Sequence, residues 1–70
     1  MNLEEKIVKA LIKLEPIMVV GLAKGFSVDL LDEAGEPRPF ELILGDLLDR
    51  IHALSRSGKR KLLSLLREAH

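Results

Sequence analysis

The sequence predicts a small, mainly all-α bundle of three to four helices, with a short extended or hairpin-like insert around residues 26–39. Two observations favour this fold class. Apolar residues recur at the three- and four-residue spacing of an α-helix along most of the chain. Hydrophobic residues make up 47% of the sequence, which supplies a core although only two residues are aromatic. Seventy residues form one small helical domain, residues 1–70, and a chain of this length buries only about 60% of the surface that its unfolded form exposes.

The first helix is expected over residues 3–14. Asn2 is a favourable N-cap, and Glu5 stands three residues later, where it completes a capping box. Pro16 disfavours helical conformation at Glu15, but proline suits the first turn of a new helix. The first helix therefore ends before Pro16, and a second one begins there.

The second helix is expected over residues 16–24, with Gly25 at the C′ position. Its residues are apolar nearly all round, which is typical of a buried central helix rather than a surface helix. The β-branched residues of this segment also permit a strand, because periodicity alone does not assign short apolar runs.

The helical pattern then vanishes over residues 26–39, which we expect to form an ordered connection. Residues 32–35 (Asp-Glu-Ala-Gly) predict a turn, so a short hairpin fits this segment. Pro37 and Pro39 each lack the backbone N–H that strand pairing needs, so any pairing is brief and lies at an edge.

The third helix is expected over residues 40–54, because its apolar residues fall within an arc of about 140°. These residues are Phe40, Ile43, Leu44, Leu47, Leu48, Ile51 and Leu54, while Glu41, Asp46 and Asp49 lie on the solvated face. Gly45 interrupts the polar side of this helix. Close approach of another chain would explain this glycine, and so would simple tolerance.

The fourth helix is expected to begin after Ser55, which offers an N-cap, and to run to about Ala69. Its apolar side consists of Leu62, Leu63, Leu65, Leu66 and Ala69.

The composition argues against an enzyme. The chain has no cysteine, which excludes disulfides and thiolate chemistry and favours a cytoplasmic location. His52 and His70 are the only histidines, and no spacing typical of a metal site surrounds them. We expect the His52 ring to pack at the edge of the apolar arc with a nitrogen in water. We predict no catalytic residue, metal, cofactor or small-molecule substrate, and residues 17–23 are too few to span a membrane.

The charge is unevenly distributed along the chain. Residues 1–54 contain six Lys/Arg and ten Asp/Glu, whereas residues 55–70 contain five Lys/Arg and one Asp/Glu. The basic residues of the fourth helix are candidate contacts for nucleic-acid phosphates. They are Arg56, Lys59, Arg60, Lys61 and Arg67, and Lys6, Lys9 and Lys13 form a second basic stripe on the first helix. The alternative is that these charges are only a solvated face.

Three apolar residues lie away from the expected core. Val8 and Ile12 form a second stripe on the first helix, and Leu42 lies outside the main arc of the third. In a simple bundle they would be exposed, which favours self-association, and twofold dimers are the commonest oligomers. The alternatives are that a small domain of several helices buries more than one side of each helix, or that scattered apolar residues on the surface need no explanation. We therefore expect a non-enzymatic interaction module that forms a homodimer and binds a protein partner; the alternative is a nucleic-acid-binding regulator that uses the basic fourth helix.

Overall fold

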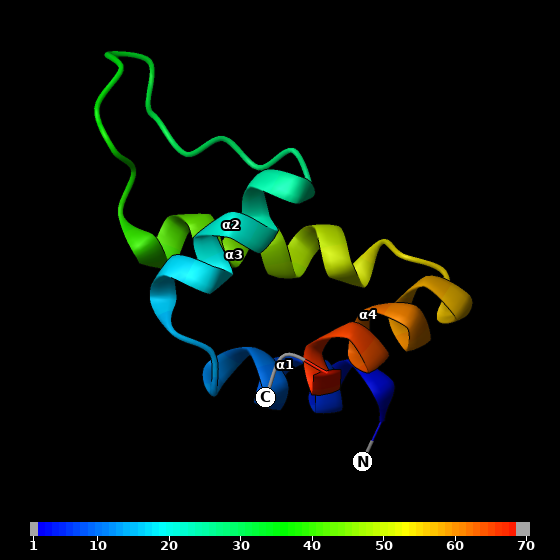
Figure 1. The fold of residues 1–70 in the computed structure, drawn as a ribbon. Coiled ribbons are helices and arrows are strands. Elements are labelled where there is room, and N and C mark those ends of the chain that lie inside the picture. The colour runs from blue at the N-terminus through cyan, green and yellow to red at the C-terminus, as the bar shows by residue number, and fades with distance from the viewer. Residues whose placement is uncertain (1, 69–70) are drawn as a thin grey trace.

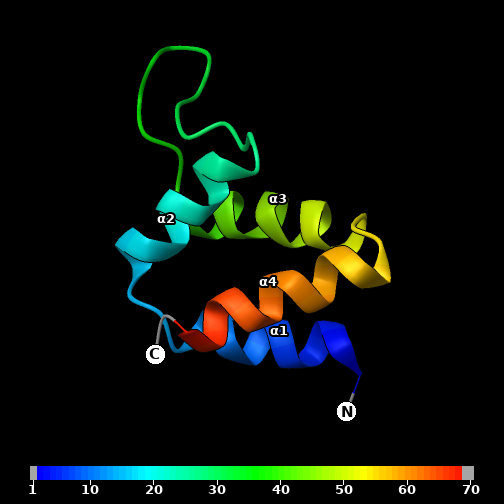
Figure 2. The same cartoon turned by 45° about the vertical axis from the view of Figure 1, so that its right-hand side comes forward.

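The structure is a computed structural model that describes residues 2–68. This part of the chain contains four helices, α1 (Leu3–Ile12), α2 (Pro16–Gly25), α3 (Phe40–His52) and α4 (Arg56–Glu68). They form two layers, with α1 packed on α4 and α2 packed on α3 (Figure 1 and Figure 2). One isolated bridge, between Leu31 and Pro37, is the only β-pairing within residues 2–68. The predicted helical fold class is therefore confirmed.

Both predicted N-caps are present. The Glu5 backbone N–H donates to Asn2 Oδ1 at 2.8 Å, and Asn2 Nδ2 donates back to Glu5 Oε1 at 3.2 Å. The return bond thus comes from the side-chain amide of Asn2 rather than from its backbone. At the start of α4, the Gly58 N–H donates to Ser55 Oγ at 3.1 Å.

Helices α1 and α3 each end two residues earlier than predicted, at Ile12 and His52. The N–H groups of Leu14 and Leu54 each donate to the carbonyl three residues back, at 3.0 Å, so one tight turn follows each helix. Both leucines still pack against the core, which is why the apolar periodicity extends past the helix end. The predicted last residue of α4, Ala69, lies outside the described residues.

The end of α2 also differs from the prediction. Gly25 is the last helical residue, and Ser27 instead adopts the left-handed conformation, with φ of 62°. The Val28 N–H donates to the Ala23 carbonyl and the Ser27 N–H to that of Lys24, both at 3.0 Å. This pair of bonds is a Schellman motif. The left-handed position of the motif is usually occupied by glycine, but here it is occupied by Ser27.

Within residues 2–68, the core is one cluster of eleven buried apolar side chains drawn from all four helices and the connection after α2. Its members are Ile7, Leu11, Val19, Ala23, Val28, Ile43, Leu47, Ile51, Leu62, Leu63 and Leu66. Leu65, which we expected on the apolar side of α4, is 62% exposed.

The expectation that α2 is a central buried helix is wrong. Its side chains Ile17 and Met18 are 77% and 44% exposed, and within α2 only Val19 and Ala23 are buried. The helix packs on α3 at the edge of the fold. Four short helices in two layers provide too few neighbours to surround any one of them.

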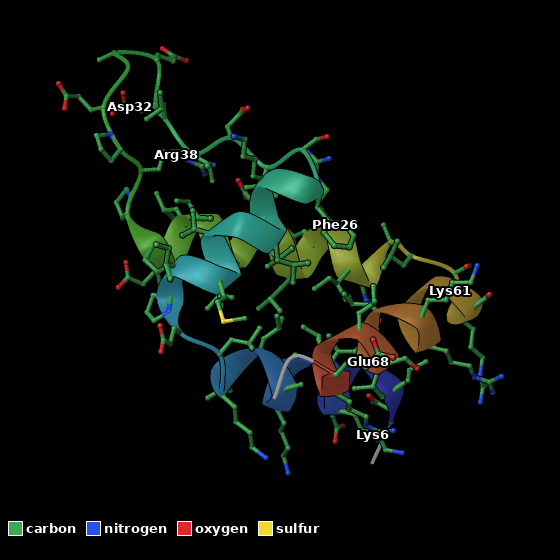
Figure 3. All side chains as sticks on the ribbon, in the orientation of Figure 1. Lys6, Phe26, Asp32, Arg38, Lys61 and Glu68 are labelled. Atoms are coloured by element: carbon green, nitrogen blue, oxygen red, sulfur yellow. The ribbon has the colours of Figure 1, made fainter. Side chains whose placement is uncertain are left out.

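The connection between α2 and α3 is ordered by polar contacts and extends away from the helices (Figure 1). At its tip, Asp32 Oδ1 accepts the N–H groups of Ala34 and Glu36, both at 2.9 Å. Arg38 lies on the return arm, nearer to α3 than Asp32 does (Figure 3).

Arg38 anchors this connection to the helices. Its guanidinium donates to the Asp29 carbonyl at 2.7 Å and pairs with the Asp46 carboxylate on α3 at 2.8 Å. Asp46 is thus an ion-pair partner, rather than only part of the solvated face that the sequence predicts. The single bridge confirms that pairing in this connection is brief, as the two prolines predict.

Candidate functional site

An apolar groove of about 390 Å³ lies between the two helical layers. Residues of α1, the start of α2 and α3 form its walls, and among residues 2–68 none of the side chains that line it is polar. These residues are Val8, Leu11, Ile12, Leu14, Pro16, Val19, Phe40, Leu44 and Leu48. Small-molecule sites usually place a few polar groups that orient the ligand, so this groove better suits apolar side chains of a protein.

Helix α1 contributes side chains to both the core and the groove, and Leu11 belongs to both. Ile7 and Leu11 are fully or almost fully buried in the core. Val8 and Ile12, one turn apart and about 40° apart around the helix, form a ridge at the outer edge of the groove. A shallow depression of about 410 Å³ lies on the other side of this ridge, and its lining includes Glu5. The remaining lining residues of this depression are Asn2, Glu4, Val8, Lys9 and Ile12.

The structure brings together two of the three predicted self-association residues. Val8 is half-buried and Ile12 is 75% exposed, and both line the groove. Leu42 is 55% exposed but does not line it. Leu42 is two residues away from both Phe40 and Leu44, which belong to the groove wall. Its side chain therefore points about 160° away from theirs around the axis of α3. Sequence periodicity did not identify the walls contributed by α2 and α3.

A second concave surface, the basic hollow, lies between the start of α1 and the first half of α4. Its volume is about 720 Å³. Three of the five predicted phosphate-contacting residues line it, together with Lys6 of the second basic stripe. The full lining is Asn2, Leu3, Glu4, Lys6, His52, Arg56, Lys59 and Arg60. The other predicted basic residues, which are Lys61, Arg67, Lys9 and Lys13, do not line it.

The Glu4 carboxylate joins three helices at the edge of this hollow. Its Oε1 accepts a hydrogen bond from Lys59 Nζ of α4 and lies 2.9 Å from His52 Nδ1 of α3. The hydrogen bond from Lys59, and then the one with His52, hold the pKa of Glu4 below its ordinary value of 4.5, although partial desolvation opposes them. The His52 side chain is 78% exposed, so its ring does not pack against the apolar arc as the sequence predicted.

The described part of the chain shows no cluster of three or more His, Cys, Asp or Glu side chains suited to a metal ion. Among the helices of residues 2–68, none is long and apolar enough to cross a membrane. Comparison of the chain with models of protein families, with curated proteins and with solved structures found no match.

Proposed function

We propose that this protein is a non-enzymatic interaction module that forms a homodimer through the apolar groove and the Val8–Ile12 ridge beside it. The observation that carries the proposal is an open groove between the layers whose lining side chains, among residues 2–68, are all apolar. A domain of 70 residues has room for only a small core, and association is a common way for small domains to bury more apolar surface.

The exposed area is consistent with a second copy as the partner. The chain exposes 5037 Å², whereas a monomer of 7.8 kDa is expected to expose about 4,400 Å². The excess of roughly 600 Å² approaches the 800 Å² or so that each partner contributes to a standard interface. The protruding connection and the open groove both add to this excess.

The shape and charge of α1 favour an antiparallel arrangement of the two copies. The Val8–Ile12 ridge stands between two hollows, so the ridge of a second copy can pack into them, as ridges pack into grooves between helices. Glu5 lies towards the N-terminal end of the exposed face of α1, and Lys9 and Lys13 lie towards its C-terminal end. Antiparallel pairing about a twofold axis brings unlike charges opposite each other, whereas parallel pairing brings like charges together.

The test is the mass in solution, measured by sedimentation or light scattering over a range of concentrations. We expect wild type to reach twice the 7.8 kDa of one chain at micromolar concentration. Ile12→Asp removes one apolar side chain from each copy, a loss of about 3 kcal/mol in total, which weakens the dimer about 100-fold. Because Ile12 is 75% exposed, the monomer should remain folded.

Leu42→Asp is the matched control, since Leu42 is an exposed apolar residue outside the groove. It should leave the mass unchanged. A wild type that stays monomeric at micromolar concentration contradicts the proposal. If Leu42→Asp dissociates the dimer and Ile12→Asp does not, the interface lies elsewhere. Once a dimer is established, other protein partners can be sought with the Ile12 variant as the negative control.

A second candidate function is contact with nucleic-acid phosphates through α4. The observation that favours it is the gathering of Arg56, Lys59 and Arg60 with Lys6 at one surface. Binding to a labelled random duplex and a single strand, titrated from low to physiological salt, tests it. Affinity that falls log-linearly with salt supports this candidate, and absence of binding at low salt contradicts it.

A further inference from the structure

The basic hollow collects cations from two helices around one concave space. Lys6 comes from α1, and Arg56 and Arg60 come from the first two turns of α4. The two arginines are four residues apart, so their side chains share one face of α4. The hollow, at about 720 Å³, has room for a ligand of several heavy atoms between them.

None of these three cations has an ion-pair partner among the described residues. Lys6, Arg56 and Arg60 make no side-chain ion pair within residues 2–68, where the ion pairs join Arg38 to Asp46, and Glu4 to both His52 and Lys59. Glu4 is the one carboxylate that lines the hollow, and it is already engaged. With Glu4 paired to Lys59, the lining keeps a net positive charge, and a cleft lined mainly by charges of one sign concentrates ions of the opposite sign.

We infer that the basic hollow binds a compact anion with several negative charges, made of two or three linked phosphate groups. The planar guanidinium groups of Arg56 and Arg60 match phosphate oxygens with paired N–H donors. Arg56 is also the first residue of α4, and the N-terminal end of a helix carries a partial positive charge that favours anions. This inference uses the same basic residues as the second candidate function but is an alternative to it, and it does not depend on self-association.

The placement of the other basic residues favours a compact ligand over a duplex. Arg67 lies seven residues beyond Arg60, which is about 10 Å along the helix axis, and Lys61 is turned about 100° around it. Neither lines the hollow, and Lys61 and Lys6 lie well apart (Figure 3). The basic residues of α4 therefore do not form one continuous track for a nucleic-acid backbone. The cations of the hollow, in contrast, line one concave surface.

Glu4 is an internal competitor for such a ligand. Its carboxylate sits at the edge of the hollow and holds Lys59, whose side chain is only 17% exposed. An entering polyphosphate gains the full charge of Lys59 only if Glu4 gives up that hydrogen bond. Removal of the Glu4 charge should therefore strengthen binding.

The experiment titrates the full chain with sodium tripolyphosphate at low and at physiological salt. Binding is measured by calorimetry and by changes in backbone amide chemical shifts. We expect saturable binding with one ligand per chain, with shifts centred on Lys6 and residues 56–60. Arg60→Glu should weaken binding at least tenfold. Arg67→Glu, the matched control on the same face of α4, should change it less than twofold, and Glu4→Gln should strengthen it.

Circular dichroism establishes that each variant is folded, which is expected because Arg60 and Arg67 are exposed. Equal losses from Arg60→Glu and Arg67→Glu overturn the inference, because they indicate diffuse attraction to the whole of α4. Absence of saturable binding overturns it as well. A third outcome is that tripolyphosphate does not bind but a nucleic-acid duplex does, with equal losses from Arg60→Glu and Arg67→Glu. This result supports the nucleic-acid candidate and rejects the compact site.

Discussion

Replacement of Gly45 by alanine should stabilise the protein. Gly45 lies in the middle of α3, and beyond its two chain neighbours and the adjacent backbone of its own helix, a Cβ atom built at this position meets no atom within 4 Å. Glycine inside a helix costs about 1 kcal/mol relative to alanine, because its unfolded backbone has more freedom to lose. With no steric penalty to offset this gain, Gly45→Ala should raise the free energy of unfolding by about 1 kcal/mol. For a domain of this size, such a gain raises the melting temperature by about 4–8 °C.

Thermal and urea unfolding, followed by circular dichroism at a concentration where the chain is monomeric, measure this change. Gly35→Ala is the control, since Gly35 has a φ of 80° in the turn and the same substitution should destabilise the protein there. A loss of stability in Gly45→Ala at an unchanged urea m-value refutes the reasoning. A gain in the monomer that disappears in the dimer indicates that a second chain approaches Gly45 closely, which is the other explanation for this glycine.

Three further perturbations test the fold. Ser27→Gly relieves the left-handed conformation at the end of α2, so it should raise the stability measured in thermal unfolding by about 1 kcal/mol. Leu47→Ala, at a side chain with no exposed surface, should cost about 2–5 kcal/mol and shift the urea midpoint accordingly, a large part of the total stability of a small domain. The pKa of Glu4 is lowered in the folded state, so its contribution to stability is fully present above pH 4.5 and is lost as the pH falls through the folded-state pKa. In Glu4→Gln, the free energy of unfolding, measured with urea from neutral to acidic pH, should therefore fall less steeply than in wild type. An unchanged dependence on pH would show that the carboxylate is not held by Lys59 and His52 as described.

Local signals in the sequence predict most of the helices correctly, because the residues that start a helix act on their immediate neighbours. Asn2 and Ser55 accept the N–H groups that they were expected to accept. Pro16 begins α2, and the two prolines before α3 limit pairing to one bridge. Each of these effects is decided within about four residues.

Burial is less predictable, because it depends on which helices become neighbours. Ile17 and Val19 belong to the same apolar run, yet one is 77% exposed and the other 2%. Periodicity identified Val8 and Ile12 as apolar residues away from the expected core. It did not identify the residues of α2 and α3 that form the other walls of the groove. The pairing of Glu4 with Lys59 joins residues 55 positions apart, and no pattern along the chain indicates such a contact.

The two proposed surfaces share an edge, and this predicts that they are coupled. Asn2 and Glu4 line both the basic hollow and the shallow depression beside the Val8–Ile12 ridge. In an antiparallel dimer, Lys9 and Lys13 of the second copy approach this edge and add positive charge near the hollow. Two unit charges about 10 Å apart in water interact by about 0.4 kcal/mol, so several such pairs strengthen polyphosphate binding a few-fold.

Because linkage is reciprocal, tripolyphosphate should strengthen the dimer by the same factor. Sedimentation with and without tripolyphosphate, at matched ionic strength, measures this shift. Salt should reduce the coupling, since charges about 10 Å apart are largely screened at 0.1 M ionic strength. Dissociation of the dimer by tripolyphosphate would show instead that the second copy covers the hollow, and the antiparallel arrangement on α1 would then have to be abandoned even if both surfaces bind as proposed.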